Sequence, residues 1–162
     1  MKYLSILSLF IVLICYGCNK EQVFLNDLAG EWEIITVDYQ TRDGGQLTTD
    51  LVGVRLNFST CTDEENESTR CNLSITGNGA TEILLKYNAI RPGGSGTRVL
   101  QTFGTEDNDL NTIRSVRYEV IADNFEVTFS GNTMTLVTRR LGADFAIGGV
   151  FIEGAVIVAR RP

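Results

Sequence analysis

The chain has 162 residues, which is enough for one globular domain. With 20 acidic residues, 14 basic residues and no histidine, its formal net charge at pH 7 is −6. An acidic domain is repelled by a phosphate backbone, which argues against nucleic acid as a partner. The chain lacks the most common general base and metal ligand, and no P-loop, dinucleotide fingerprint or nucleophile elbow occurs. We therefore expect neither an enzyme nor a cofactor, with a paired-carboxylate glycosidase as the distant alternative.

An uncharged apolar segment begins the chain. Residues 3–16 follow Lys2 and consist mostly of leucine, isoleucine, valine and phenylalanine. A positive charge followed by such a run is typical of a secretory signal peptide. The run has about 15 apolar residues, whereas about 20 are needed to span a bilayer. A signal peptide is therefore favoured over a transmembrane anchor.

The residues that close this segment, Cys15-Tyr16-Gly17-Cys18, resemble the lipobox of bacterial lipoproteins. The resemblance implies cleavage after Gly17, so that residues 1–17 are the signal peptide, and attachment of diacylglycerol and a fatty acid such as palmitate to Cys18. Two or more acyl chains hold a protein stably on a membrane. Asn19, where other lipoproteins carry aspartate, implies sorting to the outer membrane of a Gram-negative cell envelope. Residues 18–26 then form the lipidated cysteine and a tether, and residues 27–162 the domain.

A short amphipathic helix is predicted over residues 21–29, and Gly30 ends it. From Gly30 onward, apolar and polar residues alternate with period two, which is typical of half-buried β-strands. In the first strand Trp32 and Ile34 are expected on one face. The opposite face is expected to carry Ile35, Val37 and Tyr39. In the second strand one face is predicted to carry Val52, Val54, Leu56 and Phe58.

The polar, acidic loop of residues 62–70 lies between Cys61 and Cys71 and is predicted to be a hairpin tip. These are the two cysteines left once Cys15 is removed and Cys18 is lipidated. An even pair in an oxidising compartment favours a disulfide. In the chain-entropy model a disulfide that closes a loop of this size contributes about 3 kcal/mol to the free energy of unfolding. A metal or redox site would need closer spacing and histidine partners.

Further alternating runs follow to the end of the chain. They cover residues 71–75, 83–87, 99–103, 116–122, 125–129, 134–138, 145–152 and 155–160. Gly131-Asn132 marks a tight hairpin and Glu153-Gly154 separates the last two runs. Asp107-Asn108-Asp109 is interpreted as a solvated loop, with a calcium site as the alternative. Eight to ten strands without a long helix predict an all-β protein: an antiparallel up-and-down meander closed into a barrel of about eight strands, or a two-sheet sandwich.

The segment Leu28-Ala29-Gly30-Glu31-Trp32-Glu33-Ile34 resembles the opening of lipocalin-like domains, where a helical turn leads into Gly-x-Trp on the first strand. The resemblance implies a lipocalin-like barrel in which Gly30 permits the turn and Trp32 closes one end. It also implies a late arginine stacked on the indole, for which Arg160 is the match and Arg139 the alternative.

A lipocalin-like barrel on a lipid anchor implies a protein that binds a small apolar ligand in the cell envelope. The lining residues expected from the strand pattern are Val54, Leu56, Tyr118 and Phe125. In a small barrel such side chains also simply fill the interior. The alternative is a structural or interaction lipoprotein whose loops contact another envelope protein or a surface glycan.

Overall fold

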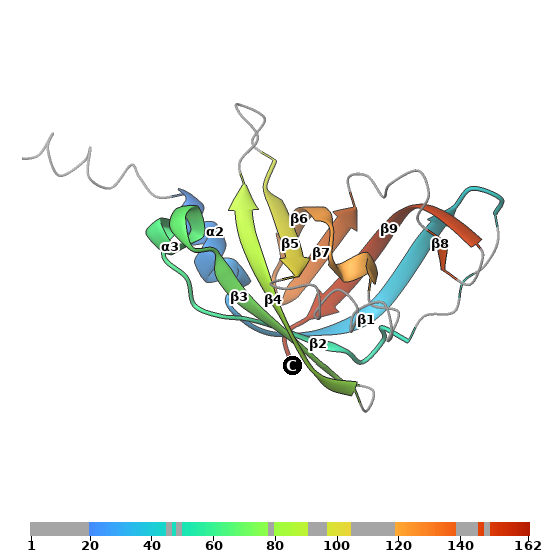
Figure 1. Cartoon of the computed structure of the whole chain (residues 1–162), viewed down its shortest axis with the longest axis horizontal. Coiled ribbons are helices and arrows are strands. Elements are labelled where there is room, and N and C mark those ends of the chain that lie inside the picture. Colours follow the sequence, from blue (N-terminus) through green and yellow to red (C-terminus); the bar gives the residue numbers. More distant parts are fainter. Residues whose placement is uncertain are drawn as a thin grey trace, which may run out of the picture.

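The computed structural model describes residues 20–44, 47, 50–77, 80–90, 97–104, 119–138, 146–147 and 150–162. The predicted signal peptide, Cys18, Tyr118, Arg139 and the 107–109 segment lie outside these residues. The described chain is a twisted antiparallel sheet with two short helices lying side by side at one end (Figure 1).

The helices are α2 (Lys20–Leu28), α3 (Asp63–Ser68) and the 3₁₀ helix η1 (Glu119–Ile121). The first strands are β1 (Gly30–Thr41), β2 (Arg55–Phe58), β3 (Cys71–Gly77), β4 (Ala80–Ile90) and β5 (Val99–Gly104). The later strands are β6 (Asn124–Ser130), β7 (Thr133–Thr138), β8 (Ala146–Ile147) and β9 (Val150–Arg160). Of the predicted tether, the residues from Lys20 onward belong to α2.

The strands form a closed barrel. From β1 to β7 each strand pairs antiparallel with the next one along the chain. Strand β9 then pairs with β7 on one side and with β1 on the other, which closes a ring made of β1 to β7 and β9. The two-residue strand β8 adds to the start of β9. The predicted meander closed into an eight-stranded barrel is therefore confirmed, and the two-sheet sandwich is not observed.

Alternate residues of each strand point inward, and the interior is apolar because these inward residues are mostly apolar. In β2, Leu56 and Phe58 are buried while Arg55 and Asn57 are exposed. Val54 is buried as predicted, but Val52 precedes the strand and is 49% exposed, so its predicted inward position is wrong. One continuous core cluster runs from α2 through the inward face of the strands.

Strand β1 contains a β-bulge that changes which residues point inward. The register of β1 against β9 shifts between Ile34 and Thr36. A bulge inserts one extra residue and reverses the alternation beyond it. Val37 and Tyr39 therefore pack against the same core as Trp32, and their predicted placement on the opposite face is wrong. The bulge keeps a long strand apolar on its inner side along its whole length.

The loop between the two cysteines is helical, which the alternation did not predict. Strands β2 and β3 do form a hairpin, but its tip holds α3. Thr62 and Glu65 form a capping box, in which the Thr62 side chain accepts from the Glu65 N–H and the Glu65 carboxylate accepts from the Thr62 N–H. This reciprocal pairing satisfies backbone groups at the start of a helix.

Two other predicted strands differ from the structure. Residues 119–121, predicted as part of a strand, form η1, in which Val120 and Ile121 are buried. Strand β9 continues through Glu153-Gly154, so the predicted break there is wrong. Gly154 approaches the Gln40 side chain so closely that a Cβ atom would lie 2.8 Å from its Oε1 atom. Glycine here serves close packing within a strand rather than a turn.

Candidate functional site

One end of the barrel is closed by α2. This end, called the sealed end, comprises α2, the start of β1, the β6–β7 turn and the residues that follow β9. The α2 side chains Phe24, Leu25 and Leu28 are buried against the barrel interior. The Phe24 ring lies 5.9 Å from the ring of Phe129 on β6. A short helix thus covers the strand ends with its apolar side.

Trp32 lies at the centre of the sealed end and is 1% exposed. Its indole Nε1–H donates to the Leu28 carbonyl oxygen at 2.7 Å, so the buried polar atom is satisfied. Its ring centroid lies 5.8 Å from that of Phe129. Gly30, two residues earlier, has φ +106°, a conformation that side-chain-bearing residues rarely adopt. The expected roles of Gly30 in the turn and of Trp32 in closing this end agree with this geometry.

The arginine stacked on Trp32 is Arg161, not Arg160. The Arg161 guanidinium carbon lies 4.7 Å from the indole centroid. Its Nη2 atom donates to the Asp27 carbonyl at 2.8 Å and to the Ala29 carbonyl at 3.3 Å. Arg160 still belongs to β9, where Ala159 points inward and Arg160 is exposed. Arg161 is the first residue after β9, so the alternation of the strand no longer fixes where its side chain points. This is why the predicted stacking residue was wrong by one position.

Three of the four predicted lining residues belong to the core cluster. Val54, Leu56 and Phe125 are each at most 1% exposed. Leu56 lies opposite Trp32 in the β1–β2 register, near the sealed end, whereas Phe125 lies opposite Leu100 and Thr138, nearer the other end. The fourth residue, Tyr118, lies outside the described residues. The cluster therefore spans the interior along its length.

The end of the barrel away from α2, called the opposite end, contains buried polar groups that the sequence pattern did not indicate. Thr102 donates to the Ile121 carbonyl and accepts from the Asp123 N–H at 3.1 Å. Thr138 Oγ1 accepts from the Ala155 N–H at 2.8 Å. Asp123 Oδ1 accepts from the Asn124 N–H at 2.7 Å, but among the described residues its buried Oδ2 atom has no hydrogen-bond partner. Burial raises the pKa of Asp123.

The predicted disulfide is present and borders a surface cleft. Cys61 and Cys71 are bonded, with their Cα atoms 5.8 Å apart. The cleft has a volume of about 200 Å³ and is called the disulfide cleft. It is lined by Ser59, Thr60, Cys61, Glu65, Thr69, Arg70, Cys71, Asn72 and Lys86. All but Lys86 belong to the segment from Ser59 to Asn72, and the β3–β4 pairing adds Lys86 to the lining.

No protein-family model, curated protein or solved structure matches the chain. What the structure itself shows is a closed antiparallel barrel with a sealed end. Within the described part of the chain, no helix is long and apolar enough to cross a membrane. In that same part, histidine, cysteine, aspartate and glutamate side chains form no group of three placed to hold a metal ion.

Proposed function

We propose that the protein is a lipid-anchored, lipocalin-like binding module that holds a small apolar ligand inside its barrel, in the cell envelope of a Gram-negative bacterium. The observation that carries the proposal is an eight-stranded barrel with an apolar interior, closed at one end by α2 and Trp32. Barrels of this size hold at most one small ligand among their inward side chains.

The anchor and the barrel fit together in this proposal. Only Asn19 separates the predicted lipidation site, Cys18, from the start of α2. An extended residue spans at most about 3.6 Å, so an acyl chain on Cys18 holds α2 close to the membrane. The sealed end then faces the lipid and the opposite end faces the solvent, from which a ligand would enter. Replacing Cys18 with serine is expected to abolish labelling by a fatty-acid probe.

A single tryptophan makes ligand binding measurable. Trp32 is the sole tryptophan of the chain and is buried at the sealed end. We expect saturable energy transfer from Trp32 to cis-parinaric acid, a fluorescent polyene fatty acid, when that probe enters the barrel. A probe adsorbed on the outer surface would give weak transfer that does not saturate.

Two neighbouring residues of β4 provide a matched pair of variants. Ile83 points inward and is 2% exposed, whereas Leu84 points outward and is 55% exposed. Ile83→Phe adds bulk inside the barrel and is expected to weaken probe binding about tenfold, or about 1.4 kcal/mol, which is within the range of overpacking penalties. Leu84→Phe adds the same ring outside and should leave the affinity unchanged. Circular dichroism checks that both variants remain folded.

Absence of saturable transfer, or equal loss in both variants, would overturn the carrier proposal. It would favour the alternative, a barrel with a filled interior whose surface contacts another envelope component. Native mass spectrometry of the protein from its own host adds a direct test. A reproducibly bound small apolar molecule supports carriage, whereas a co-purifying protein in its place contradicts it.

A further inference from the structure

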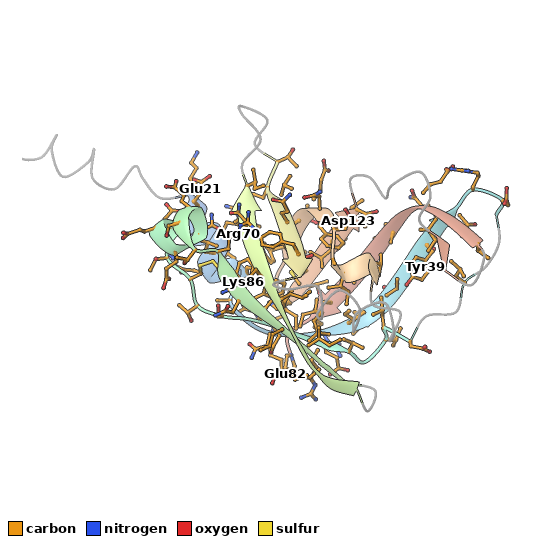
Figure 2. All side chains as sticks on the ribbon, in the orientation of Figure 1. Glu21, Tyr39, Arg70, Glu82, Lys86 and Asp123 are labelled. Carbon is orange, nitrogen blue, oxygen red and sulfur yellow. A yellow bond between two sulfur atoms is a disulfide. The ribbon has the colours of Figure 1, made fainter. Side chains whose placement is uncertain are left out.

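The disulfide cleft lies on the outside of the barrel and plays no part in the proposed carriage of an apolar ligand. It is bounded by α3 and by the outer faces of β3 and β4. Asn72, Lys86 and Phe103 are register partners across β3, β4 and β5, so their side chains share that outer face. Arg70 and Lys86 both line the cleft, and Figure 2 labels them on the same part of the sheet. We propose that this cleft binds the carboxylate-bearing sugar of an acidic surface glycan.

The walls of the cleft are held firmly in place. The disulfide joins Cys61 to Cys71 on either side of α3. Asn66 of α3 is buried and pairs with Ala89 of β4, donating to its carbonyl at 3.0 Å and accepting from its N–H at 2.7 Å. Gln22 of α2 donates to the Cys61 carbonyl at 3.0 Å and accepts from the Asp63 N–H at 3.1 Å. A site built this way needs little ordering when a ligand binds.

Two cations provide the charge that a sugar carboxylate needs. The Arg70 guanidinium carbon lies 4.1 Å from the Phe103 ring centroid, so the ring supports one face of the cation. Lys86 Nζ donates to Asn72 Oδ1 at 2.5 Å, and its ammonium group has three donors in all. A carboxylate between these groups would receive charge-assisted hydrogen bonds, which are about twice as strong as neutral ones.

The backbone of Arg70 indicates that its side chain has a use. Arg70 has φ +65°, and no other non-glycine residue in the described segments has positive φ. It follows the end of α3, where its N–H donates to the Glu65 carbonyl at 2.7 Å. Helices usually end on glycine at such a position, because a Cβ atom there costs about 1 kcal/mol. An arginine at this position sacrifices local stability, and its guanidinium is placed at the cleft.

The remaining lining groups favour a carboxylate-bearing sugar over a phosphate group or a polyanion. Ser59, Thr60 and Thr69 provide hydroxyl groups that exchange hydrogen bonds with sugar hydroxyls. Hydrogen bonds from Thr62 lower the pKa of Glu65, so this carboxylate is ionised and accepts from a sugar hydroxyl while it repels a multiply charged group. The net charge of −6 also repels polyanions. The cleft volume of about 200 Å³ is below the range typical of drug-sized ligands and suits a single sugar ring.

The test uses trigalacturonic acid as the probe, with maltotriose and inorganic phosphate as comparisons. Binding to the full domain is followed by amide chemical shifts. We expect trigalacturonic acid to shift amides of α3, β3 and β4 and to bind about tenfold more tightly than maltotriose. Phosphate binding as tightly as trigalacturonic acid, or maltotriose binding equally well, would overturn the assignment.

Two variants locate the site and one serves as a control. Arg70→Gly and Lys86→Gln are each expected to weaken trigalacturonic acid binding about tenfold, as the loss of a hydrogen bond to a charged group implies. Arg55→Gln removes a cation that pairs with Glu31 at 3.1 Å outside the cleft, and it should leave affinity unchanged. Equal weakening in all three variants would reduce the effect to net charge and contradict the site. Binding of cis-parinaric acid should persist in every variant, so failure here is separate from failure of the carrier proposal.

Discussion

The two ends of the barrel differ in how they treat buried polar groups. At the sealed end the Trp32 Nε1–H donates to Leu28, and Arg161 donates to the Asp27 and Ala29 carbonyls. At the opposite end one buried carboxylate oxygen of Asp123 has no partner in the part of the chain that the structure describes, and burial raises the pKa of Asp123. A buried polar group that is paired costs little stability, whereas an unpaired one lowers the stability of the fold.

This difference suggests a division of labour along the barrel axis. The sealed end joins α2, β1 and the residue after β9, which are the two ends of the described chain, into one packed unit. Among the described residues, the opposite end includes the three-residue η1 and the segment 51–54, which belongs to no helix or strand. Regions of the second kind are those that open most readily in proteins. We therefore expect stability to be concentrated at the sealed end and binding at the opposite end.

The largest effect is expected from Trp32→Ala, which tests directly whether stability is concentrated at the sealed end. It removes a buried indole together with its contacts to Phe129 and its hydrogen bond to Leu28. Large-to-small substitutions of this kind cost about 3–5 kcal/mol in the free energy of unfolding. Urea unfolding followed by circular dichroism measures the loss. Val137→Ala, at a position 38% exposed on β7, should change stability by less than about 0.5 kcal/mol. A loss below about 1 kcal/mol for Trp32→Ala would show that the sealed end is not the stable unit.

An intermediate loss of stability is expected from Arg161→Ala, and its neighbour Arg160 provides the control. Arg161→Ala removes the cation stacked on Trp32 and two hydrogen bonds to α2 carbonyls, so we expect a loss of about 1–2 kcal/mol. Arg160→Ala changes an exposed side chain and should cost less than about 0.5 kcal/mol. Both free energies come from urea titrations of the purified variants. Similar losses for the two would mean that the cation–π contact contributes nothing specific.

The arginine pair also shows how far the sequence could predict this structure. The alternation of apolar and polar residues follows directly from the geometry of a strand, and it was enough to predict an all-β meander. The choice of a barrel over a sandwich came from the resemblance around Trp32. The same alternation cannot say where a strand ends, and the residue that stacks on Trp32 is the first one beyond that end. The bulge at residues 34–36 caused a similar error in β1. Because it inserts one residue, every residue after it points to the face opposite to the one that the alternation predicts.

The helix α3 was missed although a local signal was present. Thr62 and Glu65 have the spacing of a capping box, which marks the start of a helix, but the polar, acidic segment between the cysteines was interpreted as a hairpin tip. The disulfide cleft could not have been predicted from either pattern. Arg70 directly precedes β3 and Lys86 belongs to β4, so their closeness depends on the β3–β4 register, which the alternation of apolar and polar residues does not specify.

The smallest effect on stability is expected from Asp123→Asn at the opposite end, and this effect depends on pH. Its pKa is raised in the folded protein, so between the unfolded value and the folded value the native state binds more protons. Stability from this group is therefore present at low pH and is lost as pH rises through the folded pKa. Asp123→Asn removes the charge but keeps the oxygen that accepts from Asn124. We expect it to raise stability at pH 7 by up to about 1 kcal/mol, since the residue is only partly shielded from solvent.

The same substitution at the sealed end should act in the opposite direction. Asp27 is an exposed carboxylate 3.5 Å from the Arg98 guanidinium, and Asp27→Asn removes that attraction. Surface pairs of this kind contribute between about 0 and 1 kcal/mol, so this variant should be neutral or slightly destabilised at pH 7. Urea midpoints of both variants, measured from pH 7 down to pH 3, give the comparison. The stability gained by Asp123→Asn should vanish at the acidic limit, where the carboxyl group is protonated in both the folded and the unfolded state. A gain that persists at pH 3 would assign the effect to packing. A loss of stability at pH 7 would mean that the Oδ2 atom is paired.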